Sequence, residues 1–305
     1  MEDSPPPFFE DVPAGHKSGY VAIIGKPNVG KSTLMNAMLG HKLSIVTRKP
    51  QTTRHRVIGI DSAPAHQVIF LDTPGIIKPR YGLHEAMMGQ VEGAIRDADL
   101  LLFLHEATQE KPDTFSLEQA GDQAAFLVLT KMDLIPNEEA LPLVESYQEL
   151  RAFDEVVPTS AKTGQNVETL VDLIVETMPE GHPFYPKEMI SEHPERFFVA
   201  EIIREKAFQQ YHEEIPYSLQ VNIVDYEERP EGDKDFIDAE IVVTRNSHKG
   251  IIIGEGGSAL KRLGTRARND IEDFVQSPVY LQLHVKTRKN WRDRESYLRS
   301  YGYRE

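Results

Sequence analysis

The sequence contains no cysteine and only one tryptophan among its 305 residues. The lack of cysteine excludes disulfide bonds, thiolate zinc sites and a cysteine nucleophile, and it is compatible with a reducing cytosol. No apolar run approaches the roughly 20 residues that a membrane-spanning helix needs, so we expect a soluble or at most peripheral protein. The eleven histidines show no metal-ligand spacing.

Positive charge is also scarce, with 34 Lys and Arg against 48 Asp and Glu. The net charge of -14 by itself argues against a general nucleic-acid binder. The charge is unevenly distributed, however. Residues 1–195 hold 16 basic and 29 acidic side chains, whereas residues 245–305 hold 13 basic and 7 acidic ones. This asymmetry and the length predict two domains with different partners.

Residues 1–18 are acidic and proline-rich, and they resemble neither a signal peptide nor an Arg-rich transit peptide, so we predict a disordered tail. Residues 19–180 alternate strand-like runs with helical patterns, which predicts an α/β domain with a mostly parallel, doubly wound sheet. Ligands of such sheets bind beyond the carboxyl ends of the strands. The expected strands are Tyr20–Ile24, Val57–Ile60, Val68–Leu71, Leu100–Leu104, Phe126–Leu129 and Glu155–Val157.

The first strand is followed by G-x-x-x-x-G-K-S at Gly25–Ser32 and then by a helical pattern to Leu39. In this context, backbone N–H groups would surround the β-phosphate of a nucleotide at the positive end of the helix. Lys31 would contact the β- and γ-phosphates, and the Ser32 hydroxyl would bind Mg²⁺. The predicted contacts are Gly25, Lys26, Pro27, Asn28, Val29, Gly30, Lys31, Ser32 and Thr33.

Two further segments predict the surroundings of the γ-phosphate. Asp72-Thr73-Pro74-Gly75 follows the third strand, where Asp72 can hold the water shell of a metal and the Gly75 N–H can approach the phosphate. The polar segment 44–56 could fold onto Mg²⁺ and phosphate in one nucleotide state and release in the other.

The last two strands are followed by Thr130-Lys131-Met132-Asp133 and by Ser160-Ala161-Lys162. The Asp133 carboxylate can accept hydrogen bonds from N1–H and the exocyclic amine of guanine, a donor pair that adenine lacks. Asp133 therefore predicts GTP rather than ATP, with the stem of Lys131 beside the ring and the Ala161 N–H available to guanine O6.

The motifs at Gly25–Ser32, Thr53, Asp72–Gly75, Thr130–Asp133 and Ser160–Lys162 resemble the five motifs of the translation-factor-related P-loop GTPases. This resemblance implies Ser32, Thr53 and, through water, Asp72 as Mg²⁺ sites, and catalytic roles for Lys31, Thr53 and Gly75. It also makes Asn28 a candidate K⁺ ligand, although support of the loop conformation explains Asn28 equally well.

The chain departs from the commoner motifs at two positions. Thr130 replaces an asparagine but keeps a hydroxyl for hydrogen bonds within the loops. Ile76 replaces the glutamine that orients the attacking water in Ras-like proteins. Because isoleucine cannot hydrogen-bond water, we expect slow intrinsic hydrolysis.

Proline and glycine are dense after the helical pattern Val167–Thr177, which predicts a linker at 181–195 and a second domain at 196–305. The expected order is helix, two strands, glycine loop, helix and strand, and it predicts a small α+β domain. These elements are Phe197–Tyr211, Ser218–Glu227, Phe236–Thr244, Ala259–Val275 and Val279–Lys286.

The segment Ile251–Lys261 carries an apolar run, a G-x-x-G loop and the start of a cationic helix. This pattern resembles the type II KH module, which clamps single-stranded nucleic acid. Glu255 would repel phosphate, and Trp291 could either stack on a base or complete the core. The predicted RNA contacts are Lys249, Ile253, Gly254, Glu255, Gly256, Gly257, Ser258, Lys261, Arg262, Arg266, Arg268, Lys286, Arg288, Lys289 and Trp291.

The chain resembles the Era family of bacterial GTPases over nearly all of its length. The resemblance lies in the order of a P-loop GTPase domain and a KH domain and in the segment Gln51-Thr52-Thr53-Arg54. The resemblance implies binding to the 3′ end of 16S ribosomal RNA and a role in assembling the small (30S) ribosomal subunit. It also implies a cytoplasmic location with peripheral inner-membrane association, and no DNA partner. The expected cofactors are Mg²⁺ and GTP or GDP, with K⁺ as a candidate, and we expect GTP and RNA affinities to be coupled reciprocally.

Two alternatives stay open at this point. The first is a metabolic or RNA-processing enzyme driven by GTP, although no further catalytic constellation of histidines and carboxylates is apparent. The second is a signalling or membrane-associated GTPase whose C-terminal domain binds protein.

Overall fold

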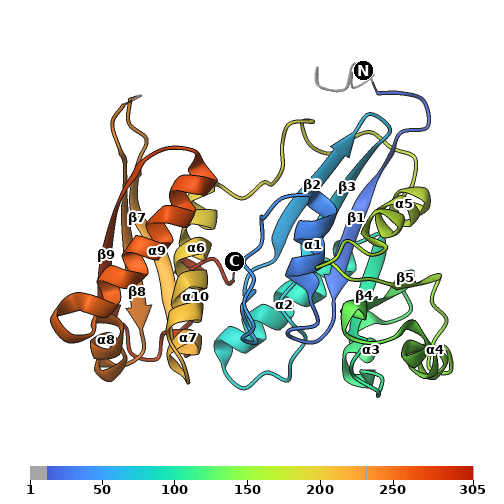
Figure 1. The fold of residues 1–305 in the computed structure, drawn as a ribbon, viewed down its shortest axis with the longest axis horizontal. Helices are drawn as coiled ribbons and strands as arrows, with labels where there is room; N and C mark the ends of the chain where they lie inside the picture. Colours follow the sequence, from blue (N-terminus) through green and yellow to red (C-terminus); the bar gives the residue numbers. More distant parts are fainter. Residues whose placement is uncertain (1–11, 231, 305) are drawn as a thin grey trace. The chain divides into compact units, whose positions relative to one another are not determined.

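The computed structural model describes residues 12–230 and 232–304, and its backbone divides into two compact units (Figure 1). The first unit comprises residues up to Ser44, Thr53–Lys78 and Met87–Glu192. The second comprises Ile45–Thr52, Pro79–Ala86 and His193 to the C-terminus. The second unit thus includes two short stretches from the first half of the sequence.

The first unit is built on a six-stranded sheet with the order β2-β3-β1-β4-β5-β6. All neighbouring strands are parallel except β2, which runs antiparallel to β3. Every predicted strand is present, and the mostly parallel sheet is confirmed. The strands are β1 (Lys17–Ile24), β2 (Val57–Ala63), β3 (His66–Asp72), β4 (Leu100–Glu106), β5 (Ala125–Thr130) and β6 (Glu155–Pro158).

Strands β4 and β5 are buried along almost their whole length, as expected for parallel strands covered on both faces by helices. Short 3₁₀ turns η2 (Met132–Leu134) and η3 (Asn137–Ala140) follow β5. The helices are α1 (Lys31–Leu39), α2 (Gly82–Asp97), α3 (Thr114–Ala120), α4 (Leu141–Gln148) and α5 (Val167–Thr177).

The predicted tail 1–18 is wrong at its end. Lys17 and Ser18 belong to β1 and pair with His66 and Gln67 of β3. The strand was predicted from its apolar residues, so the pattern did not include Lys17 and Ser18, whose side chains are polar. Residues 1–11 lie outside the described part of the chain.

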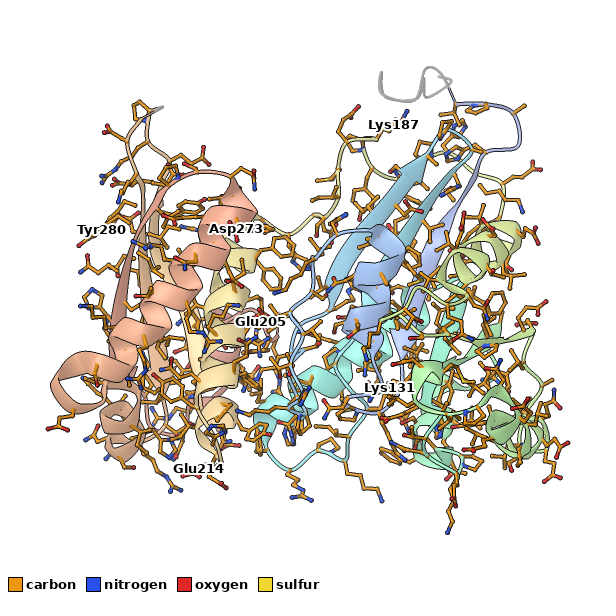
Figure 2. The ribbon with its side chains drawn as sticks, in the orientation of Figure 1. Lys131, Lys187, Glu205, Glu214, Asp273 and Tyr280 are labelled. Carbon is orange, nitrogen blue, oxygen red and sulfur yellow. The ribbon has the colours of Figure 1, made fainter. Side chains whose placement is uncertain are left out.

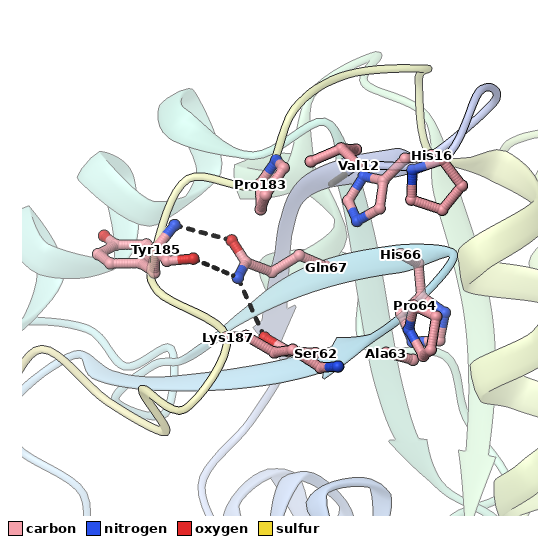
Figure 3. Close-up of a pocket in the computed structure, with 11 residues that line it drawn as sticks. Val12, His16, Ser62, Ala63, Pro64, His66, Gln67, Pro183, Tyr185 and Lys187 are labelled. Atoms are coloured by element: carbon pink, nitrogen blue, oxygen red, sulfur yellow. Dashed lines mark hydrogen bonds between the residues drawn. The ribbon is translucent and has the colours of Figure 1, made fainter. Parts of the chain in front are cut away.

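The predicted linker is held against the first unit along much of its length. Gln67 is 1% exposed, and its Oε1 accepts hydrogen bonds from the backbone N–H groups of Phe184 (2.7 Å) and Tyr185 (2.9 Å). Its Nε2 donates to Tyr185 O (2.9 Å) and Ser62 Oγ (3.0 Å) (Figure 3). The chain then covers the edge strand β2, since Ile60 N donates to Ile190 O (2.9 Å).

Figure 3 also shows a pocket of about 270 Å³ beside Gln67, lined in part by His16, His66 and Lys187. None of the residues predicted to bind the nucleotide lines this pocket.

The second unit contains a three-stranded sheet with the order β7-β8-β9. β7 and β8 are antiparallel, whereas β8 and β9 are parallel. Its strands are β7 (Gln220–Glu227), β8 (Asp235–Val243) and β9 (Val279–Thr287). Its helices and 3₁₀ turns are α6 (Glu195–Gln210), α7 (Ile215–Ser218), α8 (Asn246–Ile253), η4 (Glu255–Gly257), α9 (Ser258–Val275), η5 (Trp291–Asp293) and α10 (Glu295–Ser300).

The predicted element order of this unit was incomplete, because it lacked α8. The apolar residues Ile251–Ile253, expected as the approach to the glycine loop, form the last turn of this helix. Ile252 is fully buried and Ile251 is exposed, which is the pattern of a helix with one face on the core. With α8 included, the order is the type II KH arrangement.

Candidate nucleotide site and RNA groove

The loop between β1 and α1 has a backbone that requires glycine at two positions. Gly25 (φ 141°) and Gly30 (φ 102°) both have positive φ, and a Cβ on Gly25 would lie 2.5 Å from Leu104 O. Gly30 is also the N-cap of α1, and no side chain caps it. The first N–H groups of α1 are therefore available to a phosphate.

The Lys31 ammonium lies within this loop, and the residue is 6% exposed. Its Nζ donates to Gly25 O (3.0 Å) and Lys26 O (2.8 Å). Burial lowers the pKa of Lys31 to about 8, although the charges of Asp72 and Asp113 oppose the shift. A nucleotide phosphate would supply a stronger partner for this desolvated cation.

The three side chains predicted around Mg²⁺ meet at the N-terminal end of α1. Ser32 Oγ donates to Asp72 Oδ2 (2.6 Å) and lies 2.9 Å from Thr53 Oγ1. Asp72 is fully buried, and burial raises its pKa. Its Oδ1 has no hydrogen-bond partner among the described residues. An orphaned oxygen on a buried carboxylate beside two hydroxyls fits a Mg²⁺ ion with bound water, because Mg²⁺ prefers oxygen ligands.

The segment Asp72–Gly75 packs closely against the phosphate loop. Thr73 Oγ1 donates to Ile23 O (2.7 Å), and Ile76 N donates to Gly25 O (3.0 Å). A Cβ on Gly75 would lie 2.6 Å from the backbone N of Pro27. Only glycine permits this approach, which places the Gly75 backbone next to the phosphate loop.

The motif after β5 is tied to the phosphate loop by its first residue. Thr130 Oγ1 donates to Val29 O (2.6 Å) and lies 3.2 Å from His105 O. The expectation that threonine supplies hydrogen bonds within the loops is confirmed. The next residue, Lys131, has positive φ (61°), and its Nζ pairs with Glu106 Oε2 at 2.7 Å.

The guanine motifs after β5 and β6 come together at Asp133. Its Oδ1 accepts a hydrogen bond from Ser160 Oγ (2.7 Å), and its Oδ2 lies 3.5 Å from Lys162 Nζ. The Ser160 hydrogen bond lowers the pKa of Asp133. At neutral pH the side chain is thus a charged acceptor held in one orientation. Met132 is 3% exposed and packs in the core, so only its backbone is available to a ligand.

Sequence reasoning missed Asp113 and Glu106, which are the partners of two predicted lysines. Asp113 is 2% exposed, and its Oδ1 lies 3.2 Å from Lys26 Nζ. Asp113 also caps α3 by accepting a hydrogen bond from Ser116 N, which is a recognisable N-cap pattern. Glu106, the partner of Lys131, ends β4, so the strand-end rule could have found it.

The glycine loop of the second unit joins α8 to α9 through left-handed backbone. Gly254, Gly256 and Gly257 have φ values of 71°, 56° and 80°. A Cβ on Gly254 would also lie 2.7 Å from the Cβ of Ala259. Gly257 is the N-cap of α9, and no side chain caps it. The loop therefore offers open backbone at a helix N-terminus to an anion.

A groove of about 380 Å³ runs from this loop along α9 and β9. Gly257, Lys261 and Arg268 were predicted as RNA contacts and line it. The prediction missed the uncharged part of the lining, because it selected the glycines and cations of α9 and because β9 comes long after the loop in the sequence. The missed lining residues are Leu260, Gly264, Thr265, Leu281 and Leu283.

The prediction that Trp291 can stack on a base is wrong. Trp291 is 0% exposed, and its Nε1 donates to Ser218 O (2.9 Å) in the interior. It completes the core, the alternative that the sequence left open.

Two predicted RNA cations also take other partners. Lys286 forms an ion pair with the buried Glu240, and Arg288 Nη2 lies 3.6 Å from the same carboxylate. Neither lines the groove. Lys286 lies on the opposite face of β9 from Leu281 and Leu283, and Arg288 follows the end of the strand.

The other predicted RNA contacts stay predictions. Ile253 packs partly on the core, Glu255 is exposed, and Arg266 donates to Gln209 Oε1 (2.7 Å). The remaining positions, Lys249, Ser258, Arg262 and Lys289, lie near the groove in sequence but do not line it.

These features define a class of protein, a P-loop GTPase joined to a KH domain. Comparison with family models agrees, matching residues 20–131 to the 50S ribosome-binding GTPase family and residues 214–292 to the KH domain family. Among the described residues, no helix is long and apolar enough to cross a membrane.

Known proteins resemble nearly the whole length of the chain. "GTPase ERA1, chloroplastic" of Zea mays is 51% identical over 297 residues, which cover 95% of this chain and 71% of the relative. "GTPase ERA-like, chloroplastic" of Arabidopsis thaliana is 50% identical over 94% of this chain and 69% of its own length.

Two solved structures of Era cover 95% of this chain and 100% of their own, at 40% identity. One is an Aquifex aeolicus Era variant bound to GDP and AlF₄⁻ (TM-score 0.90). The other is Era in complex with MgGDPNP and nucleotides 1506–1542 of 16S ribosomal RNA (TM-score 0.91). The chain belongs to the Era family of GTPases.

Proposed function

We propose that this GTPase is a Mg²⁺-dependent switch that binds single-stranded 16S ribosomal RNA near its 3′ end and acts in assembly of the 30S subunit. The observation that carries the RNA part is the groove along α9, which joins a glycine loop of left-handed backbone to Lys261 and Arg268. Glycines let a nucleic-acid backbone approach, and the cations and helix start meet its phosphates. The related Era structure with an RNA fragment supports the choice of partner.

In the nucleotide site, Ser32, Thr53 and Asp72 would hold Mg²⁺, Asp72 through water. A Mg²⁺ ion held there would supply positive charge that neutralises the phosphates of the nucleotide. Lys31 would leave its carbonyl partners for the phosphates, and Asp133 would select guanine. Asn28 has positive φ (67°), so it supports the loop conformation, and we keep it as a candidate K⁺ ligand.

We infer that intrinsic hydrolysis is slow. Ile76 is 3% exposed and packs in the core of the first unit, so its side chain offers no polar group to orient a water. Catalysis would then rest on Lys31, Thr53 and the Gly75 N–H, with the attacking water positioned by another group.

The two stretches from the first half of the sequence that belong to the second unit provide a route for coupling nucleotide binding to RNA binding. Ile45–Thr52 directly precedes Thr53 and belongs to the second unit. There Lys49 Nζ donates to two carbonyls at the end of α6, Phe208 O and Tyr211 O, and Val46 N donates to Glu205 Oε1 (2.9 Å). Glu205 lies on α6 (Figure 2).

The stretch Pro79–Ala86 is held in a similar way. Gly82 N donates to Asp293 Oδ1 (3.1 Å), and the Arg292 guanidinium lies 4.5 Å from the Tyr81 ring centroid. Capture of Thr53 by Mg²⁺ and of Gly75 by the γ-phosphate would strain or release these contacts. By linkage, RNA that favours one arrangement must then change GTP affinity by the same factor.

The coupling is tested by measuring RNA affinity with GDP and with a non-hydrolysable GTP analogue. Equal affinities in the two states would refute it. Lys31→Ala should abolish nucleotide binding or hydrolysis.

The placement of the RNA clamp is tested by Gly257→Asp. Nothing lies within 4 Å of a Cβ at this position, so the variant adds a negative charge without a steric clash, and the φ of 80° adds backbone strain within the loop itself. It should weaken RNA binding while GTP hydrolysis without RNA is unchanged. Normal RNA binding by this variant would show that the clamp lies elsewhere, and a lack of salt dependence would favour a protein partner.

The location of the protein rests on family resemblance. We propose a cytoplasmic protein with peripheral association with the inner membrane and no DNA partner, while the names of the plant relatives place those proteins in chloroplasts. Cell fractionation with and without high salt tests this.

A further inference from the structure

The sheet of the second unit has one face that the RNA groove does not use. Ile237, Ala239 and Ile241 of β8 pack in the core with α6 and α9, so the residues between them point to the other face. The C-terminal segment covers one end of that face, where Tyr303 OH donates to Gln220 Oε1 (2.6 Å). The other end, which we call the open sheet face, consists of Asp225, Phe236, Asp238, Tyr280, Gln282 and His284.

Two carboxylates lie opposite each other on the open sheet face. Asp225 of β7 pairs in register with Asp238 of β8, an arrangement that is destabilising for like charges. Within the described residues, no Lys or Arg forms an ion pair with either one. His284 Nε2 lies 3.4 Å from Asp238 Oδ1, but this buried oxygen accepts no hydrogen bond. Asp225 Oδ1 already accepts from Tyr226 N (2.9 Å), so the face offers the remaining exposed oxygens of two carboxylates that no Lys or Arg among the described residues neutralises.

An exposed aromatic ring adjoins these carboxylates. Tyr280 is 55% exposed and stacks on Phe236, with ring centroids 6.0 Å apart and planes at 15°. Its side chain leaves β9 on the side away from α9 (Figure 2). The Arg229 guanidinium lies 5.5 Å from the centroid of Phe236, so this stack already holds one guanidinium within the chain. The outer face of Tyr280 offers the same contact to an external one.

We propose that the open sheet face binds an extended, arginine-containing segment of a basic protein partner. One guanidinium would lie between Asp225 and Asp238, where a planar donor can serve two carboxylates. Phe236 and its partner Tyr280 lie two residues along the strands from Asp238, about 7 Å away. Arginines at alternate positions of an extended segment have the same spacing, so the second would stack on Tyr280.

The same chemistry disfavours nucleic acid on this face, because the carboxylates repel phosphate. β9 thus contributes Leu281 and Leu283 to the RNA groove and Tyr280 and Gln282 to the opposite face. The two surfaces can be occupied together. The proposal is independent of the nucleotide and RNA functions assigned above.

The test uses the full chain and a fluorescent peptide of about eight residues that alternates arginine and threonine, with binding followed by anisotropy at about 0.15 M salt. The double variant D225N/D238N should weaken binding about tenfold or more, and Tyr280→Ala several-fold. The matched control is E138Q/E139Q, which changes the net charge equally at exposed sites of the first unit. An equal loss in this control, or no loss in D225N/D238N, would overturn the proposal.

Two further measurements separate binding from folding and from RNA. D225N/D238N should unfold at the same temperature as the parent or higher, because it removes a cross-strand repulsion. A lower midpoint would overturn the proposal, because it would show that the two carboxylates do not repel each other in the folded protein. Single-stranded RNA held at one equivalent of the protein, so that no free RNA remains to bind the basic peptide, should leave peptide affinity unchanged within about twofold, whereas loss of peptide binding to the protein would overturn the proposal.

Discussion

Trp291→Phe separates the two roles that the sequence allowed for the only tryptophan. The indole is 0% exposed, donates from Nε1 to Ser218 O (2.9 Å), and lies 5.6 Å from the ring of Tyr301 and 6.4 Å from that of Tyr303. Phenylalanine keeps the aromatic character that base stacking needs. It removes the buried donor and part of the ring volume.

The expected cost follows from these two losses. The Ser218 carbonyl would remain buried without this donor, at about 1–3 kcal/mol. The smaller ring would leave a void on the order of 40 Å³, which adds about 1 kcal/mol. We therefore expect the free energy of unfolding of the second unit to fall by about 2–4 kcal/mol, and its midpoint by roughly 10–20 °C.

Calorimetry measures the change in stability, and RNA anisotropy at a temperature well below the unfolding midpoint measures any change in RNA affinity. RNA affinity of the folded variant should stay within about threefold of the parent, and RNA should not quench the tryptophan emission of the parent protein. Tyr280→Phe, at a ring that is 55% exposed, is the control and should change stability by less than about 0.5 kcal/mol. Unchanged stability with RNA affinity reduced about tenfold or more would refute the reasoning and assign Trp291 to stacking.

Three further perturbations test the two binding sites. Because burial lowers the pKa of Lys31 to about 8, GDP affinity should fall by up to about tenfold per pH unit above that value as the cation loses its proton. Titrations up to about pH 9.5 check this, and constant affinity would exclude a charged Lys31 from binding. Asp133→Asn should weaken GTP binding about 100-fold or more, and it should improve binding of xanthosine triphosphate, whose O2 can accept a hydrogen bond from the new amide. Competition titration of the two nucleotides measures this. An unaltered preference for GTP would show that Asp133 does not contact the base. Gly254→Ala places a Cβ at positive φ (71°) and 2.7 Å from Ala259 Cβ, so it should strain the loop by about 1–3 kcal/mol. RNA affinity, measured by anisotropy, should fall. GTP hydrolysis without RNA, measured by phosphate release, should be unchanged.

The nucleotide site was predictable because its information is local. Each motif follows a strand of a parallel sheet, and parallel strands bring their carboxyl ends to one edge. The meeting of Ser32 with Asp72, and of Asp133 with Ser160, follows from that rule. The sequence did not reveal Asp113, because its role depends on which side chain faces Lys26 across the fold.

The RNA domain was predictable only in part. The G-x-x-G loop and the cations of α9 stand next to each other in sequence, so they were found without a structure. The helix α8 was missed because its final apolar turn also fits an approach to the loop. Leu281 and Leu283 reach the groove from a strand that follows α9, and no local pattern connects them with Gly257.

The sequence by itself determined the two domains, the order of the nucleotide motifs, the choice of guanine and the glycine loop, since these depend on residue type and spacing. Only the tertiary structure decided that Trp291 is core and that Lys286 pairs with Glu240. It also assigned Ile45–Thr52 to the second unit. Burial and pairing are set by residues distant in sequence, whose approach the chain specifies only when the whole core has packed.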